Sequence, residues 1–225
     1  MARPRPDPAE IGATQAPDIV RAELESVEPA ALEPGFELEG VSLARSALAG
    51  AEAGSGRLER AHLDEVDLAG AKLRGLRLVD VSGERISAVN GDWRGADLRQ
   101  VDFEGSRLTG LDLGESRLDE VRFRGCKLDY LNFRQCEIEQ VSFEDCLLGA
   151  ADFQGARIYA TRFSGCQLGS ADFSNAELSH VDFRGSDLEL AGSVLGLRGA
   201  IVDTPQLIEL SRTIAAELGI AVKDA

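Results

Sequence analysis

A large apolar side chain recurs at every fifth position from Phe36 to Leu190, without an insertion. These 155 residues form 31 pentads, and the third residue of a pentad is Leu, Ile, Phe or Trp in all but three, the exceptions being Ala53, Gly83 and Ala88. Neither the period of an α-helix nor that of a β-strand places one large apolar residue on one side every five residues. A chain that turns a corner in each pentad does so, and the sequence therefore predicts a solenoid.

Two longer periods predict the size of one coil. Phe occupies the third position every ten residues from Phe103 to Phe183, with Leu113 in one of these places. The first position is β-branched every twenty residues, at Val101, Val121, Val141, Thr161 and Val181. Four pentads therefore make one coil, and the two Phe columns should face each other across the core. The small third residues at positions 53, 83 and 88 predict a local kink or bulge in the N-terminal third.

Many of the pentads share a motif of a small residue, then Asp or Asn, then Leu or Phe, then two variable residues. Examples are ADLRQ, LNFRQ, ADFQG, ADFSN and VDFRG. This motif resembles that of the pentapeptide repeat family. The resemblance implies an all-β solenoid, a right-handed quadrilateral β-helix of about 7–8 coils over residues 31–200, with the third residue of each pentad filling the interior.

The two ends of the chain do not follow the repeat. Thr204 is expected as the N-cap of a C-terminal α-helix, with Pro205 as its first residue and Gly219 just beyond its end. Residues 201–225 are therefore expected to cap the solenoid or to pair two copies into a homodimer. The apolar stripe of this C-terminal helix comprises Leu207, Leu210, Ile214 and Leu218.

Residues 1–30 are rich in Pro, Ala and Glu, and we expect a flexible N-terminal arm there.

Cysteine and histidine, which often act as catalytic residues or metal ligands, are better explained as structural residues in this sequence. Cys126, Cys136, Cys146 and Cys166 all occupy the first position of a pentad, where other pentads have Ala or Ser, and this indicates buried packing residues. His62 and His180 have no triad or metal-binding partner nearby in the sequence. A filled solenoid also offers no pocket. We therefore predict no catalytic residues, no metal site, no cofactor and no small-molecule substrate, and hence a protein that is not an enzyme.

The charge of the chain narrows the classes of partner. The net charge of −15 disfavours direct binding to nucleic acids or to anionic membranes, and leaves basic protein surfaces as partners. The sequence has no apolar run long enough to span a membrane and no signal peptide pattern, so a cytoplasmic location is expected.

Negative charge is concentrated in residues 137–190, which hold 10 acidic and 3 basic residues. Asp92, Asp112, Asp152 and Asp172 recur every twenty residues apart from Asn132, and should align along one face. Such residues can accept hydrogen bonds from the backbone at turns, or they can form a partner-binding surface. The candidate residues for partner binding are Asp152, Asp172, Asp182, Asp187 and Glu189.

The resemblance also implies a function. Mycobacterial and plasmid-borne quinolone-resistance members of the family act as DNA-shaped decoys that bind DNA gyrase, and the segment LRGAIVDTPQLIELSRTIAAELGIAV resembles the tail of the mycobacterial members. This resemblance implies a DNA-mimicking protein that binds DNA gyrase and protects it from quinolones or other topoisomerase poisons. The alternative is a structural scaffold solenoid that binds an unrelated protein partner.

Overall fold

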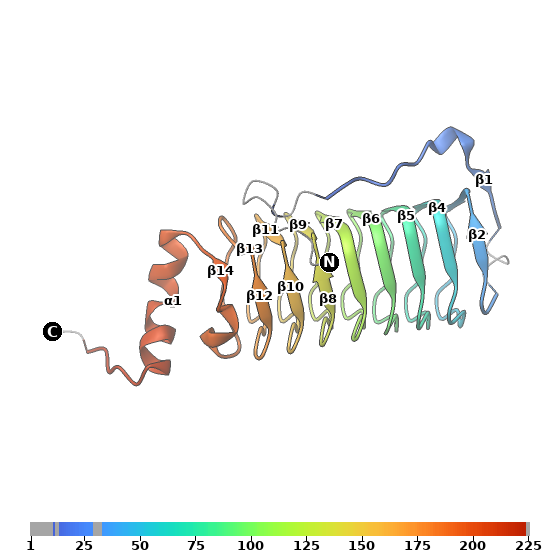
Figure 1. Ribbon diagram of the computed structural model, residues 1–225. Helices are drawn as coiled ribbons and strands as arrows, with labels where there is room; N and C mark the ends of the chain where they lie inside the picture. Colours follow the sequence, from blue (N-terminus) through green and yellow to red (C-terminus); the bar gives the residue numbers. More distant parts are fainter. Residues whose placement is uncertain (1–10, 12–13, 29–32, 224–225) are drawn as a thin grey trace, which may run out of the picture.

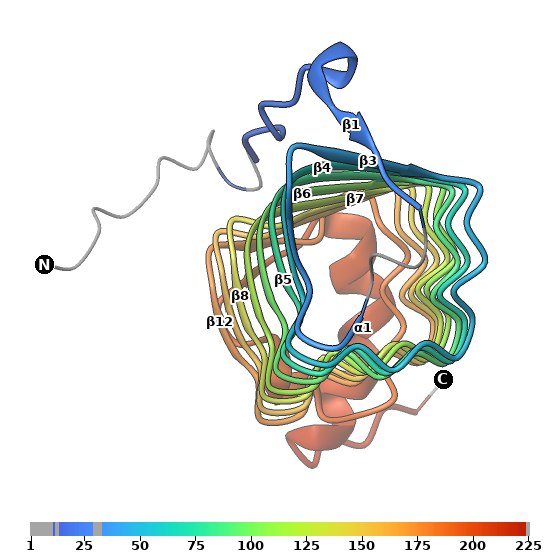
Figure 2. The same ribbon diagram turned by 90° about the vertical axis from the view of Figure 1, so that its right-hand side faces the viewer.

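A computed structural model describes residues 11, 14–28 and 33–223. Its dominant feature is a β-helix, a stack of four-sided coils (Figures 1 and 2). Strand pairs within the repeat are parallel and join residues twenty apart, such as Leu58 with Leu78 and Phe123 with Phe143. Each coil therefore uses four pentads, so the solenoid predicted from the five-residue period is confirmed, as is the all-β character that the family resemblance implied.

We number the four walls of the β-helix by the pentads that build them. The first wall begins with residues 36–40, the second with 41–45, the third with 46–50 and the fourth with 51–55, and each wall recurs every twenty residues. The first two walls carry regular strands, whereas the third and fourth walls are joined by isolated bridges.

The strands divide between the first two walls. Those confined to the first wall are β2 (Glu37–Glu39), β8 (Glu137–Glu139), β10 (Arg157–Tyr159) and β12 (Glu177–Ser179). Those confined to the second wall are β1 (Glu25–Ser26), β3 (Val41–Ala44), β9 (Ser142–Glu144), β11 (Arg162–Ser164), β13 (Val181–Asp182) and β14 (Ala200–Ile201). Four longer strands bend from the first wall to the second, namely β4 (Arg57–Asp64), β5 (Arg77–Glu84), β6 (Asp97–Glu104) and β7 (Arg117–Arg124).

The β-helix is right-handed, as expected. In Figure 2, which looks from its N-terminal end, the first wall lies on the left and the second at the top, and the chain recedes clockwise toward α1. Ten strands stack in order along the second wall. This stack is longer than the expected 7–8 coils, because β1 pairs with β3 at one end and β14 with β13 at the other. Both end strands lie outside the pentads.

The core consists of two facing columns of aromatic rings. On the second wall, the ring centroids of Phe123 and Phe143 are 5.0 Å apart and those of Phe143 and Phe163 are 4.6 Å apart, both pairs stacked. On the fourth wall, Phe133 stacks on Phe153 at 4.7 Å. The columns meet edge to face, with 6.0 Å between the centroids of Phe133 and Phe143. The predicted columns across the core are confirmed, and this geometry is one that aromatic pairs prefer.

The small third residues do not kink the solenoid. Gly83 pairs in register with Leu63 on one side and with Phe103 on the other. A Cβ atom at Gly83 would lie 3.1 Å from Cδ1 of Phe103, so this ring occupies the space that a side chain would fill. Trp93, in the coil that holds Ala88, is 1% exposed. The predicted kink is wrong because large neighbours compensate for the missing volume.

The corners are formed by the fifth residue of each pentad. Every fifth residue from Gly40 to Gly185 has a positive φ, and most of these residues are not glycine. The corners in β4 and β5, for example, fall at Arg60 with φ 49° and Asp80 with φ 52°. A left-handed residue between extended residues redirects the chain, and this conformation produces the turn from one wall to the next.

The C-terminal end is closed by η4 (Val194–Leu197), β14 and α1 (Thr204–Glu217). The N-cap of α1 is Asp203 rather than the predicted Thr204, because Asp203 and Gln206 form a reciprocal capping box. Gln206 also donates hydrogen bonds from Nε2 to the carbonyl oxygens of Phe183 (2.6 Å) and Ser186 (2.7 Å). The first turn of α1 therefore satisfies carbonyl groups that the last coil leaves without a partner layer.

The described N-terminal residues run back along the second wall (Figure 1). The segment contains η2 (Arg21–Glu23) and ends in β1, which adds a layer to the stack. Much of the predicted arm at residues 1–30 lies outside the described residues. Within the described part of the chain, no helix has the length and apolar character that crossing a membrane requires.

Candidate functional site

The fourth wall carries the ladder of acidic residues that the sequence singled out. Asp92, Asp112, Asn132, Asp152 and Asp172 are joined in this order by parallel bridges. Each side chain accepts a hydrogen bond from the backbone N–H two residues later, as in 3.0 Å from Gly114 to Asp112 and 2.8 Å from Ser174 to Asp172. This is the Asx turn, so the side chains of the ladder serve the corner geometry.

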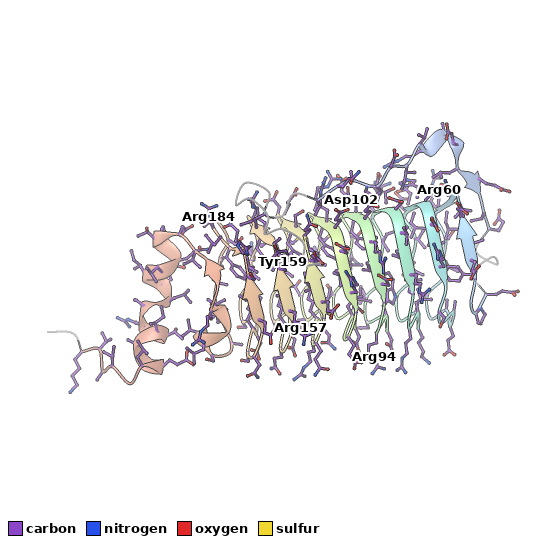
Figure 3. All side chains as sticks on the ribbon, viewed as in Figure 1. Arg60, Arg94, Asp102, Arg157, Tyr159 and Arg184 are labelled. Atoms are coloured by element: carbon purple, nitrogen blue, oxygen red, sulfur yellow. The ribbon has the colours of Figure 1, made fainter. Side chains whose placement is uncertain are left out.

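Basic residues neutralise much of this ladder. Arg74 lies 2.7 Å from Asp92, Arg94 lies 3.3 Å from Asp112, and Arg134 lies 3.5 Å from Asp152. Figure 3 shows Arg94 projecting from the lower edge of the β-helix. The fourth wall is therefore close to charge-balanced as far as Asp152.

Asp172, the last residue of the ladder, has neutral hydrogen-bond donors in place of an arginine. Burial by itself would raise the pKa of Asp172, but hydrogen bonds from Ser174 and Gln154 together with the charge of Arg134 outweigh burial and hold the pKa below its usual range. The Nε2 atom of Gln154 lies 2.5 Å from this carboxylate. Asp172 therefore remains ionised and is only partly screened.

Asp182 has a structural role in the second wall. Its side chain is buried and accepts hydrogen bonds from Nε (2.9 Å) and Nη2 (2.8 Å) of Arg184, while Arg162 lies 3.6 Å away. Burial would raise the pKa of Asp182, but these bonds and the two arginine charges lower it. Figure 3 shows Arg184 near the C-terminal end of the solenoid. A partner cannot reach Asp182 without breaking this pair.

Asp187 and Glu189 are the two exposed acids of the predicted set, and both lie on the third wall. Neither forms an ion pair with another described residue. From residue 126 to residue 190, Lys127 is the only basic residue in the pentads of this wall. The five predicted acids thus lie on three different walls, and the structure does not bring them into one patch.

A shallow recess of about 310 Å³ lies on the first wall and was not anticipated from the sequence. Glu137 and Glu177 flank Arg157, each 3.6 Å from its guanidinium group, and Tyr159 lies beside it on β10 (Figure 3). The sequence contained a signal of this row of ion pairs. The second position of successive pentads on the first wall alternates Glu, Arg and Glu every twenty residues.

The residues with reactive side chains have packing roles. All four cysteines are free and buried, and the thiols of Cys126, Cys146 and Cys166 donate to carbonyl oxygens of the preceding coil at 3.3–3.4 Å. Burial raises the pKa of Cys136 to about 12, which leaves an inert thiol. His62 is buried on the second wall, with Nδ1 2.8 Å from Oγ of Ser82. Among the described residues no group of three or more His, Cys, Asp or Glu side chains could hold a metal ion.

The C-terminal end presents the other conspicuous surface. Leu210 is buried and Ile214 packs against the core, so these two residues of the predicted stripe close the solenoid. Leu207 and Leu218 instead point to solvent, at 52% and 68% exposure. The exposed large apolar residues of this end are Leu195, Leu207, Ile208, Leu218, Ile220 and Val222.

These features define a class of protein, a filled parallel β-helix that offers walls rather than a cleft. Two protein-family models match the chain. The model described as "Pentapeptide repeat region" matches residues 116–192, and the model described as "Pentapeptide repeats (8 copies)" matches residues 89–119. Residues 89–192 of the chain therefore match the pentapeptide repeat family.

A solved structure shows the same fold. A trypsin-treated variant of QnrB1, described as a plasmid-mediated fluoroquinolone resistance protein, is 19% identical, with a TM-score of 0.51 over 84% of this chain and 91% of QnrB1. HetL, from the cyanobacterium Nostoc sp. strain PCC 7120, is 21% identical, with a TM-score of 0.47 over 76% of this chain and 88% of HetL. No curated protein matches the chain in sequence.

Proposed function

We propose that this protein is a non-enzymatic interaction module that acts in the cytoplasm and binds a basic surface of a partner protein, with DNA gyrase as the candidate partner. The observation that carries this proposal is the C-terminal part of the third wall. Asp187 and Glu189 are exposed there without ion pairs to described residues, on a wall where Lys127 is the only base after residue 125. A partner's lysine or arginine side chains would gain charge contacts at this wall without displacing an internal partner.

The likeness to QnrB1 supports the choice of gyrase as the first partner to test, since that protein is a fluoroquinolone resistance protein. The proposed activity is protection of gyrase from quinolones by a rod that imitates the charge of DNA. The acids on the fourth wall contribute less to this imitation than their number suggests, because arginines neutralise Asp92, Asp112 and Asp152.

This neutralisation favours a second candidate function, a scaffold solenoid whose surface charge serves solubility and corner geometry alone. The two candidate functions differ in whether the acidic residues of the third wall are needed for partner binding. A DNA mimic depends on Asp187 and Glu189, whereas a scaffold tolerates their replacement.

We also propose that the protein is a homodimer formed through the outer face of α1. Leu207 and Leu218 are exposed at the edge of the stripe that contains the buried Leu210, Ile208 is exposed further around the helix, and the exposed Ile220 and Val222 follow in the chain. Several large apolar side chains exposed near one another are typical of a protein interface. Two copies joined there would place their acidic C-terminal thirds on either side of the junction.

The test is a DNA supercoiling assay with gyrase, with and without a quinolone. We expect the purified protein to protect gyrase, and we expect the variant D187K/E189K to need a concentration on the order of tenfold higher for the same effect. The matched control is E37K/E39K, which reverses acids at the same two pentad positions in β2 at the far end of the rod. No effect of the wild-type protein on gyrase, or an equal loss in both variants, would favour the scaffold.

A further inference from the structure

The N-terminal segment, residues 14–28, crosses the outer surface of the second wall from β7 to the end of the solenoid (Figures 1 and 2). At β7, Arg122 donates hydrogen bonds to Oγ1 and to the carbonyl oxygen of Thr14, both at 2.9 Å. Near β5, Arg21 forms an ion pair with Glu84. At the end of the path, the N–H of Val27 donates to the carbonyl oxygen of Ser42 at 3.0 Å. We call residues 14–28 the strap.

The strap is held by polar contacts along its length and by Val27, which packs against the core at its end. None of residues 14–28 is buried, and Val20 is 55% exposed. Around η2 the strap stands away from the wall, leaving a gap of about 360 Å³ lined by strap residues and by Gly40 and Arg60. Ile11, just before the strap, is buried. Segments with few buried apolar contacts open at low free-energy cost, so the strap should separate from the wall more readily than the coils unfold.

The wall under the strap offers groups suited to binding a protein segment. Asp64, Glu84 and Asp80 lie toward the N-terminal end of the covered area, and Arg122 lies toward the other end. A segment that took the place of the strap would need a cationic side chain facing Glu84 and an acceptor facing Arg122. Arg21 and Thr14 of the strap supply these same groups.

We propose that the strap is a displaceable segment of this chain that occupies, and so conceals, a protein-binding surface on the second wall between β4 and β7. In the closed state the strap occupies the place that an extended segment of a partner protein, carrying a basic residue, would take. This surface is separate from Asp187 and Glu189 on the third wall, and its role does not depend on gyrase binding.

The first test is limited trypsin digestion of the full chain. Arg21 is paired with Glu84 while the strap lies on the wall, so the cleavage rate after Arg21 should rise with the open population. Arg122→Gln removes both hydrogen bonds to Thr14, and we expect about tenfold faster cleavage between Arg21 and Ala22, measured by mass spectrometry. The matched control is Arg124→Gln, in the same strand and on the same wall, whose side chain binds Asp102 and Glu104 and not the strap.

The second test uses His62 as a reporter in the same proteins. Burial lowers the pKa of His62, and Arg21 in the strap lowers it further, against the opposing effects of Glu84 and Asp64. An open strap would remove the charge of Arg21 from the neighbourhood of the imidazole, so the pKa of His62 should rise toward its ordinary value. Proton NMR resolves this titration because His180 is the only other histidine, and it lies outside the strap.

Two outcomes support the proposal together, namely faster cleavage and a raised His62 pKa in Arg122→Gln but not in Arg124→Gln. A second variant, Ile11→Ser combined with Arg122→Gln, removes the buried anchor and should enlarge both effects. If neither strap variant is cut faster than Arg124→Gln and the His62 pKa is unchanged, the strap is a fixed part of the wall and the proposal is wrong.

Discussion

At the scale of single residues, the fifth position of the pentad carries a recurring conformational cost. Each non-glycine residue held at positive φ costs about 1–2 kcal/mol relative to the right-handed regions. The β-helix accepts this cost at most of its corners, because each turn brings another large apolar residue into the core. The glycines at many fifth positions, such as Gly105 and Gly125, were a signal of this geometry in the sequence.

Relieving one such corner should stabilise the protein. Ala150 has φ 53° and lies on the surface side of the third wall, so Ala150→Gly removes steric strain and leaves no core cavity. We expect the free energy of unfolding to rise by up to about 1 kcal/mol, since the greater freedom of glycine in the unfolded chain offsets part of the gain. The control is Ala151→Gly, next in the chain and fully buried, which should lower stability by about 1–2 kcal/mol. Urea denaturation measures both, and a loss of stability in both variants would contradict the strain argument.

At the scale of elements, α1 has buried and exposed apolar residues that its sequence does not distinguish. The stripe of Leu207, Leu210, Ile214 and Leu218 predicted one apolar face, yet the structure buries Leu210 and leaves Leu207 in solvent. Sequence periodicity shows that a helix is amphipathic, but it cannot show how the helix is rotated against the coil below. This rotation depends on Gln206, a polar residue buried by its bonds to the last coil.

Substitutions at buried and at exposed apolar positions of α1 should therefore have different effects. Leu210→Asp buries a charge against the core and should destabilise the protein by about 3 kcal/mol or more, observed as a lower melting temperature. Leu207→Asp with Leu218→Asp alters exposed positions and should leave the melting temperature of the monomer nearly unchanged. If the outer face of α1 joins two copies, the double variant should elute as a monomer from a sizing column where the wild type elutes as a dimer. Identical elution of the two proteins would count against that interface.

At the scale of the whole molecule, the regular part of the fold and the C-terminal helix were predictable from the sequence, whereas the end layers of the stack were not. A period of five residues with one large apolar residue per pentad leaves few backbone solutions, so the walls, the core and the Phe columns followed from the sequence. The end layers β1 and β14 and the path of residues 14–28 depend on single contacts, such as Arg122 with Thr14, between residues far apart in the chain. No periodic pattern encodes such contacts. The environment of buried His62, which includes Arg21 and Glu84, also depends on contacts of this kind.

The unequal distribution of aromatic residues should divide the rod into parts of different stability. Each coil contacts only its neighbours, so local stability follows the local core. Stacked rings fill the coils from Phe103 to Phe183, whereas the first coils contain Leu43, Ala53 and Leu63 and lack this stacking. Hydrogen exchange measured by mass spectrometry should therefore show residues 36–60 exchanging well before residues 120–170. Phe143→Leu should reduce protection in the adjoining layers around Phe123 and Phe163 and leave residues 36–60 unchanged, because the effect passes through stacked neighbours. Uniform exchange along the rod, or an equal response of both regions to Phe143→Leu, would show instead that the solenoid unfolds as one cooperative unit.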